Sequence, residues 1–273
     1  MCIELEIDEY NDTELKFVVI QANKLGECLN MMQQQGYENI CISSAHGWKK
    51  GMSIEFLTKL EWVKGVWVVD DEMDFSPINN CMNLEFLSIN YSKNSKGKIN
   101  FKNLPKLKAL CINYYTPINI ENIEALVNLT YMYFSRWPFK DLVNISGNSK
   151  LQNLKLDFAR LKNLNGIENF KQLTSLKIYS APNLKSIDQI EPLALILKNV
   201  YFELCPNIDS YKAVNNMNNI ESFYIARSSP IHSAQFLKNT PNLRYAYIGV
   251  EVNDKDIQVL KDKGIEYKKF KAY

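Results

Sequence analysis

Residues 151–178 read LQNLKLDFARLKNLNGIENFKQLTSLKI, and this stretch contains one apolar pattern twice. The pattern is Leu-x-x-Leu-x-Leu. It begins at Leu151 and begins again, with isoleucine in the last place, at Leu173. Apolar residues at alternate positions are typical of a β-strand with one buried face. The stretch therefore predicts two short strands separated by the same length of chain.

The same pattern recurs outward in both directions, at spacings of 22 to 24 residues over the eight clearest copies. Their first residues are Leu84, Leu107, Leu129, Leu151, Leu173, Leu197, Ile220 and Leu243. The pattern extends back to Val63 and Tyr37 and forward to Ile265. A second apolar column, six residues before most first positions, supports this register. The chain is therefore built from internal repeats.

The repeat has a physical consequence, because one coil of about 22 residues cannot bury its own apolar side. Stacked coils bury a continuous core, and their strands pair in parallel about 4.8 Å apart. The sequence thus predicts an α/β solenoid whose strands form one parallel sheet.

The Leu-x-x-Leu-x-Leu motif, followed by spaced apolar residues, resembles the leucine-rich repeat, and the short period is similar to internalin-type repeats. The resemblance covers about residues 60–270 and implies a parallel sheet on the concave face of the solenoid. One feature departs from the family, because the ninth position usually carries an asparagine. Here the ninth residues are Ser92, Tyr115, Trp137, Ala159, Ala181, Cys205, Ser228 and Glu251. We therefore expect the backbone polar groups of the turn after each strand to find other hydrogen-bond partners.

Both ends of the repeat array carry segments that are suited to capping it. Residues 2–8 and 15–20 predict a β-hairpin, and residues 24–35 predict a helix that Gly36 ends. At the other end, residues 254–263 predict a helix and residues 265–270 a last strand. We expect an N-terminal cap over residues 1–55. It is continuous with residues 56–273, which contain the repeats and a C-terminal cap.

Composition excludes several classes of protein. Thirty-two basic and 30 acidic residues give a net charge of +2, which argues against a general nucleic-acid binder. No apolar run is long enough to span a membrane, and the first residues do not resemble a secretory signal. These features predict a cytoplasmic protein that does not insert into membranes. The six scattered cysteines are then expected to be reduced thiols.

Motifs for chemistry are absent from the sequence. It has no glycine-rich phosphate loop, no GxSxG and no HExxH, and its two histidines lie apart, at 46 and 232. The acidic run at residues 70–74 could hold a cation or a basic partner, but its spacing does not match a calcium loop. A lysine-rich segment at residues 93–108 could touch phosphates. In both cases a solvated loop is the simpler interpretation. We predict no enzyme activity, catalytic residue, metal or cofactor.

The strongest functional signal is the set of aromatic and charged residues at the third, fifth, seventh and eighth positions, which should face outward from the sheet. Tyrosine and arginine are enriched in the energetic centres of protein interfaces. The predicted partner-binding residues are Trp67, Asp70, Phe86, Tyr91, Tyr114, Tyr131, Tyr133, Arg136, Asp157, Phe158, Tyr179, Tyr201, Glu203, Tyr224, Arg227, Tyr245 and Tyr247. Aromatic residues also favour strands for structural reasons, so a purely stiffening role is the alternative.

These features predict a non-enzymatic solenoid that binds a protein partner on its concave aromatic face. The chain resembles cytosolic bacterial immunity proteins, which neutralise a toxin domain. The resemblance lies in its short irregular repeats, its lack of a secretory signal and a composition rich in Asn, Lys and Ile. The alternative is an adaptor or substrate-recognition subunit of a larger intracellular complex, whose N-terminal residues would supply a second contact.

Overall fold

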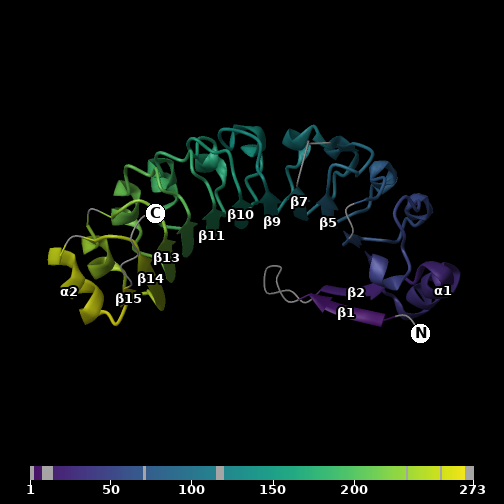
Figure 1. Cartoon of the computed structure of the whole chain (residues 1–273), viewed down its shortest axis with the longest axis horizontal. Helices are drawn as coiled ribbons and strands as arrows, with labels where there is room; N and C mark the ends of the chain where they lie inside the picture. The colour runs from purple at the N-terminus through teal and green to yellow at the C-terminus, as the bar shows by residue number, and fades with distance from the viewer. Residues whose placement is uncertain are drawn as a thin grey trace. The chain divides into compact units, whose positions relative to one another are not determined.

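The computed structural model describes residues 3–7, 15–69, 72–114, 120–231, 233–252 and 254–267. The chain divides into two compact units, Met1–Phe134 and Ser135–Tyr273. Within each unit, short parallel strands form one side of the stacked coils and 3₁₀ turns form the other (Figure 1). This is the coil-by-coil arrangement that the repeat predicts. The predicted boundary between an N-terminal cap and the repeats, at residue 55, is a different division of the chain and stays a prediction.

In the first unit the strands follow the order β1-β2-β3-β4-β5-β7-β9. They are β1 (Ile3–Ile7), β2 (Leu15–Val19), β3 (Asn39–Ile42), β4 (Gly65–Val68), β5 (Phe86–Tyr91), β7 (Ala109–Tyr114) and β9 (Tyr131–Ser135). Strands β1 and β2 pair antiparallel as the predicted hairpin, and every later pair is parallel. The short strands β6 (Ile99–Asn100) and β8 (Ile120–Glu121) form a second, parallel ladder.

The N-terminal hairpin is followed by helix α1 (Leu25–Gln35), as predicted. The helix ends at Gly36, whose left-handed φ of 72° suits glycine, and it buries Cys28 and Met32. Trp48 ties the following loop to this end of the unit, because its indole N–H donates to the Ile20 carbonyl at 2.7 Å.

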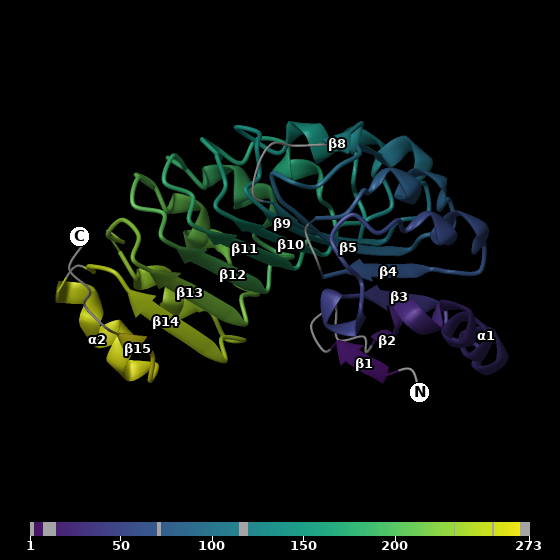
Figure 2. The same ribbon diagram turned by 45° about the vertical axis from the view of Figure 1, so that its right-hand side comes forward.

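In the second unit the strands follow one another in sequence order (Figure 2). They are β10 (Asn153–Asp157), β11 (Ser175–Tyr179), β12 (Asn199–Glu203), β13 (Ser222–Ala226), β14 (Tyr245–Gly249) and β15 (Glu266–Tyr267). Helix α2 (Asp254–Asp262) precedes β15, which pairs in parallel with β14. The predicted helix-and-strand cap is therefore confirmed for the described residues.

The 3₁₀ turns return the chain from one strand to the next. They are Ala22–Lys24, Ser44–His46, Glu55–Lys59, Ser76–Asn80, Phe101–Asn103, Ile123–Ala125, Val143–Ile145, Ile167–Asn169, Asp188–Leu193, Lys212–Asn216 and Gln235–Asn239. Most bury the apolar residue that stands six positions before the strand motif, such as Ile145 and Ile167. The second apolar column of the sequence thus packs beneath the strands.

In most repeats the core includes the first, fourth and sixth residues. Leu154 pairs with Leu176, and Leu176 pairs with Val200, so the fourth positions form a continuous buried row. Burial of each such side chain contributes about 1.5–3 kcal/mol. Since the strands are in register, the odd-numbered positions between them form matching rows on the opposite, outward face of the sheet.

In the second unit, the eighth residue of each repeat turns the chain after the strand. Five of these residues have a left-handed backbone: Arg136, Phe158, Ser180, Leu204 and Arg227, with φ between 47° and 62°. The Ser180 N–H donates to the Glu203 carbonyl at 2.8 Å, and the Leu204 N–H to the Ala226 carbonyl at 3.1 Å. The turn is thus satisfied by backbone bonds between neighbouring coils rather than by an asparagine at position nine.

Asparagine ladders occur in the first unit, but in other columns. The Asn100 N–H donates to Asn79 Oδ1 at 2.7 Å, and Asn122 Nδ2 donates to Asn100 Oδ1 at 2.8 Å. Asn113 Nδ2 donates to Asn90 Oδ1 at 2.8 Å, at the seventh position of two successive repeats. Such bonds satisfy polar groups that turns would otherwise leave unpaired.

The cysteines are mostly core residues. Cys41, Cys111 and Cys205 are buried thiols outside any disulfide, and Cys81 is a partly buried one. Cys28 is disulfide-bonded, so the prediction of six reduced thiols is wrong for this residue. Among the described residues, no helix combines the length and the apolar character needed to cross a membrane.

Candidate functional site

The outward face of the second unit carries a central row made by the fifth residues of successive repeats. In register order these are Lys155, Lys177, Tyr201, Tyr224 and Tyr247. We call Tyr201, Tyr224 and Tyr247 the tyrosine column. The row therefore changes from cationic to aromatic between β11 and β12.

The tyrosine column is a stack of nearly parallel rings. The centroids of Tyr201 and Tyr224 are 5.7 Å apart with an interplanar angle of 18°. Those of Tyr224 and Tyr247 are 5.0 Å apart at 15°. Aromatic pairs of this kind contribute about 0.5–1.5 kcal/mol beyond the area that they bury. The stack therefore holds three amphipathic side chains in fixed positions while leaving them half-exposed.

The two lysines of the row lie over tyrosine rings. Lys155 Nζ is 5.9 Å from the ring centre of Tyr179, and Lys177 Nζ is 5.0 Å from that of Tyr201. At these distances an ammonium is attracted by the negative face of the ring. The surface thus already binds cations of its own chain on its aromatic rings.

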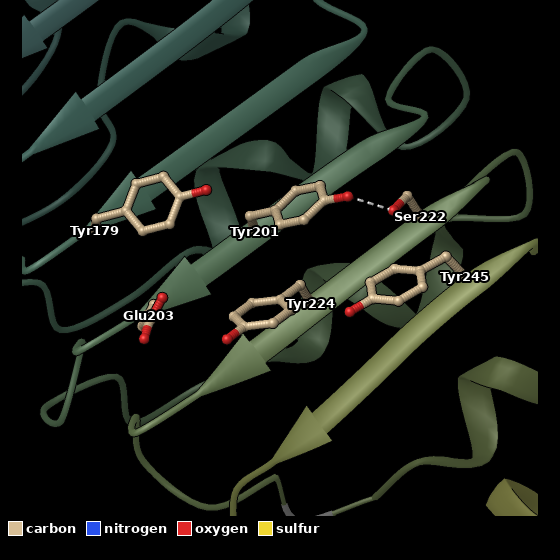
Figure 3. A pocket seen from close by; sticks show the side chains of 6 residues that line it. All are labelled: Tyr179, Tyr201, Glu203, Ser222, Tyr224 and Tyr245. Atoms are coloured by element: carbon tan, nitrogen blue, oxygen red, sulfur yellow. Dashed lines mark hydrogen bonds between the residues drawn. The ribbon is translucent and has the colours of Figure 1, made fainter. Parts of the chain in front are cut away.

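An open pocket of about 430 Å³ lies beside the column. Its lining residues are Tyr179, Tyr201, Glu203, Ser222, Tyr224 and Tyr245. Figure 3 shows the Glu203 carboxylate near Tyr179 and Tyr224, with the Tyr201 hydroxyl turned toward Ser222. The oxygens of Tyr201 and Ser222 are 2.5 Å apart, which is a short hydrogen bond. Glu203 is the one formally charged residue among the lining residues.

Two tyrosines of the pocket have raised pKa values. Burial, with smaller contributions from the neighbouring Tyr201 and Glu203, raises the pKa of Tyr179 to about 12. Burial and then Glu203 also raise the pKa of Tyr224. Burial raises the pKa of Asp157, at the end of β10. Neutral phenols and aromatic faces are groups for binding rather than for covalent chemistry.

The left-handed residues after the strands form a rim along this face, which we define as Arg136, Phe158, Ser180, Leu204 and Arg227. Phe158 is 59% exposed and Leu204 is 42% exposed. A large apolar side chain in a left-handed conformation is unfavourable both for its backbone and for its contact with water. Such residues are therefore candidates for contact with a partner.

Most predicted site residues of the second unit lie on this face. Those in the strands or at their ends are Asp157, Tyr179, Tyr201, Glu203, Tyr224, Tyr245 and Tyr247, and those in the rim are Arg136, Phe158 and Arg227. Tyr245 is 46% exposed. The structure therefore brings together residues that were predicted from the third, fifth, seventh and eighth positions of the repeat.

In the first unit the predicted outward residues are less accessible. Phe86 is buried, because its ring packs at 5.1 Å against Phe17 of the hairpin. Trp67 is half-buried, and its ring lies 6.1 Å from that of Phe17. Val19 and Cys41 complete this buried cluster on the outward face. The expectation that Phe86 faces solvent is therefore wrong, since the capping hairpin contributes its own apolar side chains.

Tyr91 also differs from the prediction. It is fully buried, with its ring 4.7 Å from that of Phe75, and burial raises its pKa well above the usual value. Tyr91 is thus a core residue. Tyr131 and Tyr133 are half-buried on β9. Asp70 and the side chain of Tyr114 lie outside the described residues.

The described part of the acidic run is engaged within the chain. Glu72 forms an ion pair with Lys50 at 2.7 Å and accepts from Asn94 at 2.5 Å. Asp74 accepts two hydrogen bonds from Ser76. Among the described residues, no cluster of three or more His, Cys, Asp or Glu side chains could hold a metal.

The charged positions of the rows on this face also indicate Lys155 and Lys177, which occupy outward position five. The sequence prediction omitted two further residues of this face, Ser222 at position three and Leu204 at position eight. The register that located the tyrosines also identifies them. Ser222 and Leu204 were omitted because they are neither aromatic nor charged.

Comparison with known proteins finds solved structures of the same fold. An internalin from Listeria monocytogenes has a TM-score of 0.59 at 16% identity, covering 85% of this chain and 72% of its own. A leucine-rich-repeat protein from Leptospira interrogans has a TM-score of 0.52 at 15% identity, covering 92% and 75%. No protein-family model and no curated protein matches the sequence. The predicted leucine-rich-repeat solenoid of the α/β class is therefore confirmed as the fold.

Proposed function

We propose that this chain binds a protein partner through the outward face of its second unit and has no catalytic role. The observation that carries the proposal is the tyrosine column, flanked by the exposed apolar rim residues Phe158 and Leu204. Tyrosine supplies large contact area at a small cost in conformational entropy, and exposed apolar groups mark interaction surfaces. The mixed charges of the face disfavour a single-stranded nucleic acid, which needs a positive groove.

The more specific form of the proposal is a cytosolic bacterial immunity protein that inhibits a toxin by occupying it. This form rests on the sequence resemblance described above. An adaptor or substrate-recognition subunit is the alternative. Both use the same face, so the identity of the captured partner distinguishes them.

The test is affinity capture from the host of this protein at low salt, comparing three tagged forms of the full chain. The first is the natural sequence. The second carries Tyr201→Ala, Tyr224→Ala and Tyr247→Ala. The third is a matched control with Val143→Ala and Leu195→Ala, two exposed apolar residues in and beside the 3₁₀ turns of the same unit.

We expect the natural and control forms to retain one stoichiometric partner and the tyrosine variant to lose it, since a central interface tyrosine contributes about 2 kcal/mol or more. A single partner whose toxic activity this chain inhibits supports the immunity role. Several subunits of one assembly support the adaptor. Equal capture by all three forms contradicts binding through this face.

A further inference from the structure

The loops that follow strands β9, β10 and β11 carry a row of lysines. Lys140, Lys162 and Lys185 stand five or six residues after the ends of these strands. The Lys162 N–H donates to the Lys140 carbonyl at 2.7 Å, and the Lys185 N–H donates to the Lys162 carbonyl at 3.2 Å. We call these three exposed residues the lysine column. Their backbones lie in register on successive coils, which are about 4.8 Å apart.

The surrounding sequence supplies few carboxylates to balance the lysine column. Residues 136–185 contain nine basic and three acidic residues, a net charge of +6, whereas the whole chain has +2. The three acids accept hydrogen bonds from nearby backbone N–H groups, Asp141 from Val143, Asp157 from Phe158 and Glu168 from Gly166. Their carboxylates therefore stabilise turns of their own coils.

Among the described residues, no lysine of the column forms an ion pair. At the second position of the repeat, by contrast, the chain opposes unlike charges on neighbouring coils. These pairs are Lys64–Glu38 at 2.8 Å, Lys108–Glu85 at 2.6 Å and Lys198–Glu221 at 3.0 Å. Like charges on adjacent strands are destabilising. The lysine column therefore retains a repulsion that the alternating pairs avoid.

The next residue of this row has the opposite charge. The Asp209 N–H donates to the Lys185 carbonyl at 2.8 Å, and Asp209 is exposed. The row thus presents three cations followed by one anion. The backbone of a nucleic acid has uniform charge, so its phosphates would be repelled by Asp209. A protein segment can place carboxylates opposite the lysines and a base opposite Asp209.

We propose that the lysine column binds an acidic segment of a protein, with a basic residue of that segment opposite Asp209. This surface lies in the loops beyond the strands, so the proposal does not depend on binding through the tyrosine column. Lysine suits such a contact, because its flexible stem lets each ammonium reach a carboxylate of an irregular segment. Complementary charge also speeds the encounter of the two proteins.

The test measures binding of two labelled probes to the full chain at low salt, by fluorescence anisotropy. The first probe is a peptide of six glutamates followed by two lysines, with blocked ends. The second is a thymidine pentanucleotide without terminal phosphates, which has the same net charge and carries the same label. We expect the peptide to bind saturably and more tightly than the pentanucleotide, and raised salt to weaken its binding.

Two triple variants locate the binding. One carries Lys140→Gln, Lys162→Gln and Lys185→Gln. The other makes the same change in net charge with Lys171→Gln, Lys212→Gln and Lys238→Gln, at exposed lysines in or beside the 3₁₀ turns of the same unit. The column variant should lose affinity for the peptide by about fivefold or more, since three exposed ion pairs each contribute modestly. The control variant should lose less than about twofold.

Asp209→Asn tests the end of the row. It should weaken binding of the peptide, whose lysines lose their partner, and strengthen binding of the pentanucleotide, which is no longer repelled. A change of the same sign for both probes would contradict this arrangement.

Equal losses in the two triple variants, no saturable peptide binding, or tighter binding of the pentanucleotide through the column would overturn the proposal. All three lysines are exposed, so the column variant should unfold at the same urea concentration as the natural sequence or a higher one. If it is less stable, the comparison of the two probes on the natural sequence and on Asp209→Asn still decides the matter.

Discussion

At the scale of single residues, Asn148 places an amide in an apolar column. Residues three positions before the strand motif include Leu104, Leu126, Phe170 and Met217, and all four are buried. Asn148 is also fully buried, and neither its Nδ2 nor its Oδ1 has a hydrogen-bond partner among the described residues. A buried polar group without a partner costs about 1–3 kcal/mol.

Asn148→Leu should therefore raise the free energy of unfolding by about 1–3 kcal/mol, as measured by urea denaturation. Thr240→Val is the control from the same column. The Thr240 hydroxyl donates to the Leu237 carbonyl at 2.7 Å, so its removal should bring no gain. A less stable Asn148→Leu protein would show that the amide is satisfied after all.

Phe158 is a residue at which stability and a surface role oppose each other. Its φ of 47° costs an ordinary L-residue about 1–2 kcal/mol, whereas asparagine adopts this conformation readily. Phe158→Asn should raise the free energy of unfolding by about 0.5–1 kcal/mol and weaken partner capture.

Val143→Asn is the matched control for Phe158→Asn, because Val143 is equally exposed but lies in a 3₁₀ turn. It should neither stabilise the protein nor change capture. Unchanged capture by Phe158→Asn would remove the rim from the proposed binding face.

At the scale of elements, two left-handed glycines end or begin helical turns under different steric conditions. Gly166, before the turn Ile167–Asn169, has φ of 98°, and a Cβ there would lie 2.8 Å from the backbone of Leu142. Gly264, after helix α2, has φ of 64° and open space around it.

Gly166→Ala should lower the free energy of unfolding by more than about 2 kcal/mol, since strain and a backbone clash add. Gly264→Ala should cost only about 1 kcal/mol from strain. Urea denaturation of both variants checks the difference. Equal losses would mean that neighbouring coils move apart easily to admit a methyl group.

The elements themselves were largely predictable from the sequence, because the apolar columns set both the strand positions and their register. Leu151, Leu154 and Leu156 are all buried as expected. The turns were less predictable. The absent asparagine at position nine indicated a different solution, but a left-handed Phe158 or Leu204 has no sequence signature, since neither residue favours that conformation.

At the scale of the whole molecule, buried and half-buried tyrosines couple stability to alkaline pH. Burial raises the pKa of Tyr179 to about 12 and moves those of Tyr91 and Tyr211 upward as well. An unfolded tyrosine ionises near about pH 10. Between these values the unfolded chain releases protons that the folded chain keeps, so rising pH favours unfolding.

These tyrosines should therefore leave the free energy of unfolding unchanged below about pH 10. Above that pH they should lower it by up to about 1.4 kcal/mol per pH unit for each such tyrosine. Urea midpoints at pH 8.5 and 11 measure the loss, and absorbance at 295 nm should show tyrosine ionisation coinciding with unfolding. Tyr91→Phe should reduce the pH dependence. A midpoint independent of pH would contradict the buried state of these phenols.

The site was predictable only where long-range packing leaves the outward rows open. Tyr201, Tyr224 and Tyr247 were found from register alone. Phe86 was misplaced because Phe17, about 70 residues earlier in the sequence, covers it, and no periodic pattern reports that contact. Tyr91 was misplaced because the strand continues to a residue that turns back onto Phe75.

The ring spacing within the tyrosine column has a consequence for the shape of a partner. The rings repeat every 5.0–5.7 Å across the strands. An α-helix repeats every turn, about 5.4 Å, whereas one side of an extended chain repeats about every 6.7 Å. A helix laid across β12, β13 and β14 would present successive turns to successive rings. An extended segment would no longer be in register with the rings by the third strand.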